Sequence, residues 1–168
     1  GISHCTDGQA EEPLNVVTVT LKEGSNPNLE HLQTLGHGTS ACGICGRTRL
    51  EDVVKRVPER QESLSLDPQW LSTLPQLLRG SQSLFETTGG VHAAGAWPAG
   101  GDLITVREDV GRHNALDKLV GALALREMLP AHQLICTVSG RASFELVQKA
   151  AVAGFSALIA VGAPSSLA

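Results

Sequence analysis

Aromatic residues and long apolar segments are both scarce in this sequence of 168 residues. It contains three Phe, two Trp and no Tyr, which leaves little material for the aromatic platforms on which single-stranded bases stack. The most apolar region, residues 150–163, is interrupted by glycines and is shorter than the roughly 18 to 20 residues that a membrane-spanning helix needs. These absences argue against a protein that binds single-stranded nucleic acid and against a membrane protein.

An excess of positive charge is also missing. Thirteen Lys and Arg face seventeen Asp and Glu, so the formal net charge is -4. A broad surface that binds nucleic acid through phosphate contacts needs clustered basic residues. We therefore expect no nucleic-acid partner, and we expect any anionic ligand to be held in a local pocket.

Cysteine is too sparse for a disulfide framework. Of the four cysteines, only Cys42 and Cys45 are close together in the sequence. A chain of this length can bury roughly 70% of its unfolded surface, so cross-links are not needed for stability. We predict a cytoplasmic protein in a reducing compartment, with a single domain over residues 1–168.

The last third of the chain predicts an α/β fold. Three short apolar runs, each typical of a strand buried on both faces, occupy residues 103–106, 134–138 and 157–161. Between them, apolar residues spaced every three to four positions predict helices over residues 116–128 and 144–154, the second capped by Ser143. This alternation predicts a three-layer helix/sheet/helix fold with a mixed or parallel sheet.

The first two thirds of the chain carry weaker signals. β-Branched residues predict a strand over residues 15–21, and a short helix is expected at residues 50–57. Asp67 followed by Pro68 predicts a capped helix start, and Pro75 predicts the start of another helix. We expect the glycine pair at 89 and 90 to end this helical region.

Cys42 and Cys45 form a C-x-x-C motif within a glycine-rich segment, residues 37–46. Such a segment is too flexible for a stable helix or a central strand, so we expect a mobile loop. Three kinds of chemistry fit: a redox pair, half of a zinc site, or a sulfur carrier that holds a persulfide. No second C-x-x-C completes a zinc site, and no helix is expected to begin at the motif as in thioredoxin-like units. From spacing alone, all three remain open, as does a pair of inert structural cysteines.

Five motifs together resemble the formate dehydrogenase accessory sulfurtransferase family, FdhD. The REDVGRHNALDK sequence among them is too long and specific to arise by chance. The motifs occur in family order across almost the whole chain, as TSACGICGR at residues 39–47, TGGVHAAG at 88–95, REDVGRHNALDKLVG at 107–121, SGRASFELVQKAAVAG at 139–154 and GAPSSLA at 162–168.

The resemblance implies a sulfurtransferase that accepts persulfide sulfur from a cysteine desulfurase. The sulfur then passes to the bis-guanine-dinucleotide cofactor of molybdenum or tungsten, a bound substrate, before formate dehydrogenase receives that cofactor. A fold similar to cytidine deaminases and a homodimer are also implied, without a catalytic metal. By position, Cys42 matches the persulfide-bearing cysteine of the family and Cys45 matches its neighbour in the loop. Gly43 and Gly46 would let the backbone that carries Cys42 move between donor and acceptor.

A second candidate site follows the strand predicted at residues 103–106, at the sheet edge where open α/β sheets bind ligands. Arg112 and His113 can face a phosphate at the helix start, and Asp109 can accept two N–H groups from guanine. On its own, this segment fits a capped helix with solvated charges better than it fits a binding site. With the family resemblance, we predict that it binds the cofactor through Arg107, Asp109, Gly111, Arg112, His113 and Asn114.

Ser139, Gly140 and Arg141 repeat the arrangement after the next predicted strand, where a plain strand-to-helix turn is the alternative. We expect the two loops to lie side by side and to hold the phosphates of the dinucleotide. His92 is a further candidate for the cofactor pocket, with a hydrogen-bonded structural histidine as the alternative. Deamination is not expected, because the H-x-E and P-C-x-x-C motifs of zinc deaminases are missing.

Relative to the family pattern, we expect this chain to lack an N-terminal portion, the last helix and a basic C-terminal tail that is implicated in cofactor binding. Two rival functions remain. One is a non-catalytic chaperone that binds the cofactor or formate dehydrogenase without covalent sulfur. The other is a metal-binding interaction module.

Overall fold

The computed structural model describes residues 1–4, 17–27, 57–58, 64–166 and 168. They fall into two compact units, Gly1–Gly38 and Thr39–Ala168, and each unit is described by itself. Cys42 and Cys45 lie outside the described residues, as does nearly all of the helix predicted at residues 50–57. The single domain stays a prediction.

The first unit contains a two-stranded antiparallel sheet. Its strands are β1 (Ile2–His4) and β2 (Val17–Val19), and Ile2 lies opposite Val19. β2 lies within the strand predicted at residues 15–21, so that prediction is confirmed. Because side chains alternate along a strand, Val17 and Val19 share one face, and both are exposed.

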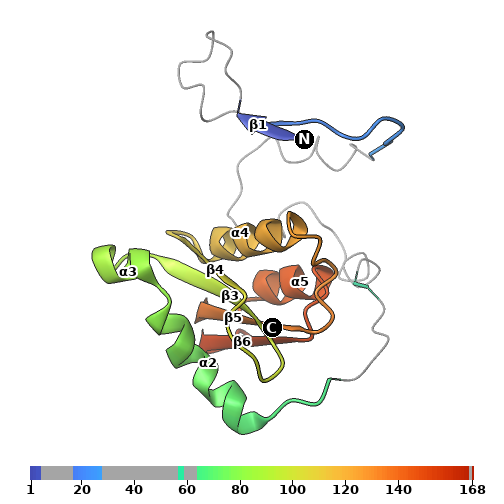
Figure 1. Ribbon diagram of the computed structural model, residues 1–168. Helices are drawn as coiled ribbons and strands as arrows, with labels where there is room; N and C mark the ends of the chain where they lie inside the picture. The colour runs from blue at the N-terminus through green and yellow to red at the C-terminus, as the bar shows by residue number, and fades with distance from the viewer. Residues whose placement is uncertain (5–16, 28–56, 59–63, 167) are drawn as a thin grey trace. The chain divides into compact units, whose positions relative to one another are not determined.

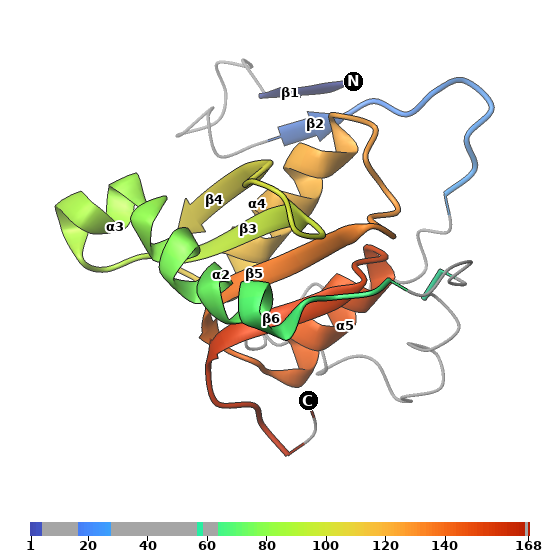
Figure 2. The same cartoon turned by 60° about the horizontal axis from the view of Figure 1, so that its bottom comes forward.

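The second unit is built on a four-stranded mixed sheet (Figure 1, Figure 2). β3 runs antiparallel to both of its neighbours, whereas β5 and β6 are parallel. The predicted α/β class with a mixed sheet and helices is confirmed, and the likeness to cytidine deaminases stays a prediction. In spatial order the strands are β4 (Thr105–Asp109), β3 (His92–Pro98), β5 (Leu134–Arg141) and β6 (Ala157–Gly162).

The central strand β3 has no strong strand signal in the sequence. Its residues, HAAGAWP, include no β-branched side chain, so its intrinsic strand propensity is weak. Tertiary packing forms the strand instead. Ala94 and Ala96 are fully buried on one face of the sheet, and Trp97 is buried on the other. Small side chains at the centre of the sheet let the helices approach it closely.

Two of the predicted strands continue beyond their apolar runs, and one is less buried than predicted. β4 extends to Asp109 rather than ending at 106, and β5 extends to Arg141 rather than ending at 138. Backbone pairing is the reason, since His92 lies opposite Asp109 and Arg141 lies opposite Gly162. β6 is an edge strand of this sheet and is only partly buried, because it pairs on one side alone among the described residues.

Helix α2 (Pro68–Gly80) begins where the sequence predicts, because the Asp67 carboxylate accepts a hydrogen bond at 2.9 Å from the amide two residues on. The helix start predicted at Pro75 is wrong, since Pro75 lies inside α2. Leu74 and Leu78, on either side of it, are fully buried. Their packing against the sheet holds the helix together across the proline.

The remaining helices are α3 (Ser83–Thr88), α4 (Arg112–Ala124) and α5 (Phe144–Val152). The predicted end at Gly89 is confirmed, because this glycine has a φ of 65° and closes α3. α4 begins earlier than the expected residue 116, directly after the β4 strand and a short turn. α5 begins after Ser143, as predicted.

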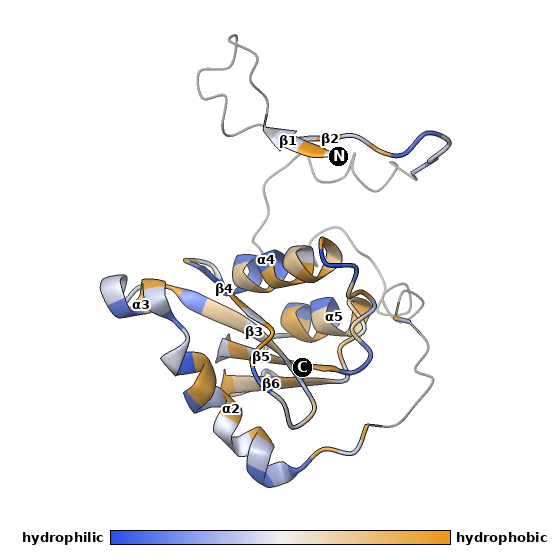
Figure 3. Ribbon diagram, viewed as in Figure 1, coloured by the Kyte–Doolittle hydropathy of each residue, from blue (hydrophilic) through white to orange (hydrophobic). Residues whose placement is uncertain are grey.

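Helices cover both faces of the mixed sheet. α4 and α5 pack on one face, where Leu116 and Leu146 belong to the core, and α2 packs on the other face against Ile135 (Figure 1, Figure 2). Figure 3 shows mainly apolar colouring along β5 and β6, as expected for strands between helices. The polar ends of β4 and β5 lie at one end of this sheet, and the candidate residues lie there.

Candidate anion-binding site

The predicted site residues that the structure describes are at the carboxyl ends of β4 and β5. Because β3 runs antiparallel to both strands, its first residue, His92, also lies at this end, opposite Asp109. α4 begins here with Arg112, and α5 begins here after β5. The cysteine pair, Cys42 and Cys45, lies outside the described residues.

Arg112, His92 and Gly140 come together although they are far apart in the sequence. A Cβ atom placed on Gly140 would lie 3.3 Å from Cδ of Arg112 and 3.5 Å from Nδ1 of His92. Nδ1 of His92 also lies 3.4 Å from the hydroxyl of Ser139, which accepts a hydrogen bond from the Ala93 amide at 2.9 Å. The end of β5 therefore brings three parts of the predicted site together: the segment after β4 that contains Arg112, the residues Ser139 and Gly140, and His92.

A β-bulge aims Arg141 toward the same face of the sheet as Arg112. The register between β5 and β6 shifts after the pair Val138 and Ala160, so that Arg141 lies opposite Gly162. Paired residues share a face, and Ala160 packs on the face that α4 and α5 cover. Without the bulge, simple alternation from Val138 would point Arg141 toward the α2 face.

Arg112 and Arg141 carry charges that no carboxylate of the described residues neutralises by direct contact. Within the described part of the chain, neither Arg112 nor Arg141 takes part in an ion pair. Nε of Arg112 is buried and has no hydrogen-bond partner there, and unpaired buried donors are uncommon in folded proteins. Two guanidinium groups near two helix starts are suited to binding a phosphate or a similar anion.

His113, in the first turn of α4, faces α5. Its side chain is buried, and Nε2 lies 3.3 Å from the Ser143 hydroxyl and 3.9 Å from the Glu145 carboxylate. Burial lowers the pKa of His113, and the charge of Arg112 lowers it further. We therefore expect a neutral ring at neutral pH that connects the starts of the two helices.

Glu145 remains ionised in this setting. Burial would raise the pKa of its carboxyl group, but hydrogen bonds from Ser143 and from its own amide, together with the charges of His113 and Arg112, bring it below its usual value. A negative charge in the first turn of α5 is also favoured by the helix dipole. Ser143 itself makes no capping hydrogen bond with its side chain, and its hydroxyl lies close to His113 instead.

Asp109 is held by neighbours from its own turn and helix. Oδ1 accepts hydrogen bonds from the Gly111 amide at 2.9 Å and from Nδ2 of Asn114 at 3.2 Å, and Oδ2 forms an ion pair with Lys118 at 2.5 Å. The hydrogen bond from Lys118, followed by that from Gly111, lowers the pKa of Asp109. Its contact with guanine stays a prediction, and a guanine edge would compete with these partners.

Arg107 makes contacts within its own strand. Its Nη1 donates to the Thr105 hydroxyl at 2.8 Å and to the Val106 carbonyl at 2.7 Å. Two further residues, Lys118 and Gly162, take part in this region without standing out in the sequence. Their positions inside the third and fifth motifs are the only sequence signal for them, because their roles depend on contacts across the fold.

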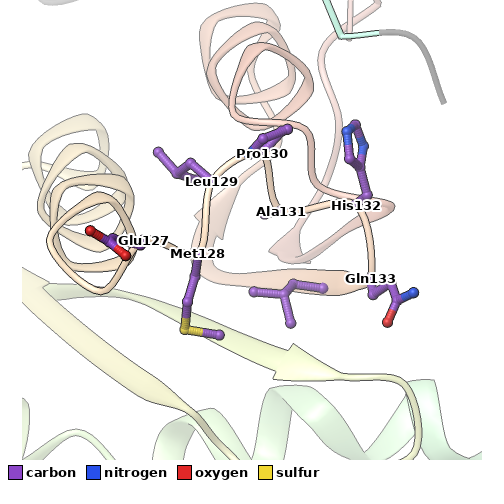
Figure 4. Close-up of a pocket in the computed structure, with 8 residues that line it drawn as sticks. Glu127, Met128, Leu129, Pro130, Ala131, His132 and Gln133 are labelled. Atoms are coloured by element: carbon purple, nitrogen blue, oxygen red, sulfur yellow. The ribbon is translucent and has the colours of Figure 1, made fainter. Parts of the chain in front are cut away.

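A separate open pocket lies at the opposite end of β5. It has a volume of about 310 Å³ and is lined by residues 127–133 of the loop between α4 and β5 and by Leu134, the first residue of β5 (Figure 4). A single continuous segment forms it, and none of the predicted site residues lines it.

The described residues include no cluster of three or more His, Cys, Asp or Glu side chains arranged to hold a metal ion. In the same part of the chain, no helix is both long and apolar enough to cross a membrane.

Comparisons with known proteins show what this chain is similar to. The family model described as FdhD/NarQ matches residues 1–168. A "Sulfur carrier protein FdhD" from Nocardia farcinica is 47% identical over 165 residues, covering 97% of this chain and 58% of that protein. A protein of the same name from Corynebacterium efficiens is 49% identical over 141 residues, covering 84% of this chain and 51% of that protein. The chain thus spans little more than half the length of these relatives.

A solved structure has a similar fold. It is the crystal structure described as a formate dehydrogenase accessory protein from Desulfotalea psychrophila. The match has a TM-score of 0.57 and 28% sequence identity, and it covers 70% of this chain and 49% of that one.

Proposed function

Because this chain belongs to the FdhD/NarQ family, we propose that it is a sulfur carrier in the maturation of formate dehydrogenase. One observation carries the proposal: the motif of Cys42 and Cys45 occurs in a chain 47% identical to a protein named as a sulfur carrier. In this proposal Cys42 holds the sulfur as a persulfide, and the chain acts as a sulfurtransferase.

Sulfur uptake needs a thiolate nucleophile at Cys42. The thiolate attacks the outer sulfur of a persulfide on the cysteine desulfurase, a new S–S bond forms on Cys42, and the donor cysteine leaves as a thiolate. In the delivery step, the Cys45 thiolate attacks Sγ of Cys42, and the outer sulfur leaves as hydrosulfide toward the acceptor. Two external thiols then reduce the resulting disulfide before the next cycle: they supply the two electrons and leave as a disulfide of their own.

The acceptor in this proposal is the bis-guanine-dinucleotide cofactor of molybdenum or tungsten, bound as a substrate. Its phosphates require a local concentration of positive charge, because the chain as a whole has a net charge of -4. Support comes from Arg112 and Arg141, which share a face of the sheet and have no ion-pair partner among the described residues. His92 and Gly140 complete the same cluster.

The partners follow from this chemistry: a cysteine desulfurase gives the sulfur, and formate dehydrogenase receives the cofactor. We also propose a cytoplasmic location and a homodimer, as the family resemblance implies. A non-catalytic chaperone for the cofactor is the second candidate, favoured by the anion-binding cluster, which requires no reactive thiol.

A labelled-sulfur assay tests the carrier role. The full chain would be incubated with a cysteine desulfurase and radiolabelled cysteine, and protein-bound label measured under non-reducing conditions. We expect label on the wild type, no label on Cys42→Ala, label that persists because its release is impaired on Cys45→Ala, and unchanged label on Cys136→Ala, the matched control for a buried thiol. Label retained by Cys42→Ala would overturn the assignment, and cofactor binding without label on the wild type would favour the chaperone.

A further inference from the structure

The geometry points to Gly140 as a positioning residue: its missing side chain leaves the space in which Arg112 is held against the end of β5 for binding the phosphate of a nucleotide. This inference deepens the proposed function and rests on it for the identity of the ligand. The placement of Arg112 by Gly140 can be tested without that ligand.

The close contact between the two residues is the first part of the evidence. Gly140 is buried in β5, and a Cβ atom there would meet Cδ of Arg112 at 3.3 Å and Cβ of Arg112 at 3.5 Å. The first distance is tighter than ordinary van der Waals contact, so a side chain at position 140 would require Arg112 to move by a few tenths of an ångström. The same Cβ would also meet Nδ1 of His92 at 3.5 Å.

Backbone conformation does not explain why glycine occupies position 140. The φ angle of Gly140 lies outside the left-handed region that favours glycine, unlike that of Gly154, which is +86°. A residue with a side chain at position 140 would therefore not meet the strain of a left-handed backbone. The space taken by Arg112 is what distinguishes this position from an ordinary strand residue.

The environment of Arg112 indicates why its placement matters. Nε is buried without a hydrogen-bond partner among the described residues, and none of the ion pairs found there involves Arg112. A guanidinium group that recognises phosphate with two parallel hydrogen bonds needs a defined orientation. In this inference packing against Gly140 supplies that orientation, since no carboxylate of the described residues pairs with Arg112.

Chemical modification of Arg112 tests the inference without any ligand. The full chain would be treated with phenylglyoxal, and the modification rate of Arg112 would be followed by mass spectrometry of its peptide. We expect Gly140→Ala to change this rate severalfold, because the arginine is displaced from its packed position. Gly121→Ala is the matched control, since a Cβ there meets nothing within 4 Å. An Arg112 rate in Gly140→Ala that equals that of the wild type would overturn the inference.

Binding of guanosine diphosphate is the second readout. We expect Gly140→Ala to weaken it about tenfold, the order of one misplaced charge-assisted hydrogen bond, and Gly121→Ala to leave it unchanged. If the wild type bound no guanosine diphosphate, the proposal that a guanine-dinucleotide cofactor is the acceptor would be rejected. The modification rates of Arg112 would still decide the role of Gly140. If Arg112→Ala weakened the binding of guanosine diphosphate but Gly140→Ala bound it fully, the role of Gly140 would be rejected while the proposed function would stand.

A double-mutant cycle covers the case in which Gly140→Ala folds poorly. In the Arg112→Ala background the close contact with Cδ no longer exists, so Gly140→Ala should be tolerated there, and its effect on the melting temperature should be much smaller. Equal destabilisation in both backgrounds would show that Gly140 does not act through Arg112.

Discussion

The imidazole Nε2 of His113, in the first turn of α4, lies 3.3 Å from the hydroxyl of Ser143, the residue before α5. This contact joins the start of α4 to the start of α5, although the two helices follow different strands. Arg112 directly precedes His113 in the chain, so this contact also fixes the backbone that carries the arginine.

The buried His113 should make stability depend on pH. Its pKa is lowered in the folded protein, first by burial and then by Arg112, while Glu145, Lys149 and Asp117 act on it more weakly. The unfolded chain therefore binds this proton more readily. The contribution of the neutral His113 to the free energy of unfolding should be fully present above the pKa of about 6.5 in the unfolded chain. It should decline as the pH falls from there toward the lower pKa of the folded protein.

Urea unfolding of the wild type and of His113→Gln at neutral and mildly acidic pH would measure this effect. We expect the wild type to lose more free energy of unfolding on acidification than the variant does, because glutamine does not titrate. An equal loss in both proteins would contradict a neutral, buried His113.

Glu108 should stabilise helix α3 from a neighbouring strand. Its carboxylate accepts hydrogen bonds from the Leu84 amide at 2.8 Å and from the Phe85 amide at 2.9 Å, while the N-cap residue Gln82 makes no side-chain capping bond. We expect Glu108→Ala to lower the free energy of unfolding by about 1–2 kcal/mol, as for loss of a helix cap. Denaturant unfolding checks this, with Asp102→Ala, at an exposed site, as the control that should change little.

Thr137 should tolerate loss of its hydroxyl group. It is fully buried, and its Oγ1 has no hydrogen-bond partner among the described residues. We expect Thr137→Val to leave the melting temperature unchanged or raise it, since removal of an unpaired buried hydroxyl gains up to about 1 kcal/mol. Thr105 is the matched control, because its hydroxyl accepts a bond from Arg107, so Thr105→Val should lower the melting temperature. A clear loss in Thr137→Val would show that its hydroxyl is paired.

Cys136 should be inert in the folded protein. It is fully buried in β5, and burial raises the pKa of its thiol far above the usual value. The reactive thiolate is thus absent under native conditions. We expect iodoacetamide to modify Cys136 only after unfolding in urea, as measured by mass spectrometry of the peptides. Rapid labelling of Cys136 in the native protein would contradict its place in the core.

Local signals were sufficient for several elements of the fold. The Asp67 carboxylate begins α2, Gly89 ends α3 with its left-handed backbone, and α5 begins after Ser143. The first two depend on backbone groups within a few residues of the signal, whereas Ser143 precedes α5 without a capping hydrogen bond from its side chain. The strand β3 and the continuation of α2 through Pro75 depend on burial against distant elements, so local propensity gives the wrong answer there.

The order of residues by itself determined the family, the cysteine pair and the α/β class, because motifs and hydrophobic spacing are properties of neighbouring positions. Tertiary structure alone decided how the site is assembled. Only the bulge opposite Gly162 turns Arg141 to the face of Arg112, and only the pairing of strands brings Gly140 against that arginine. Such contacts arise from the register of strands distant in the sequence, which no local pattern encodes.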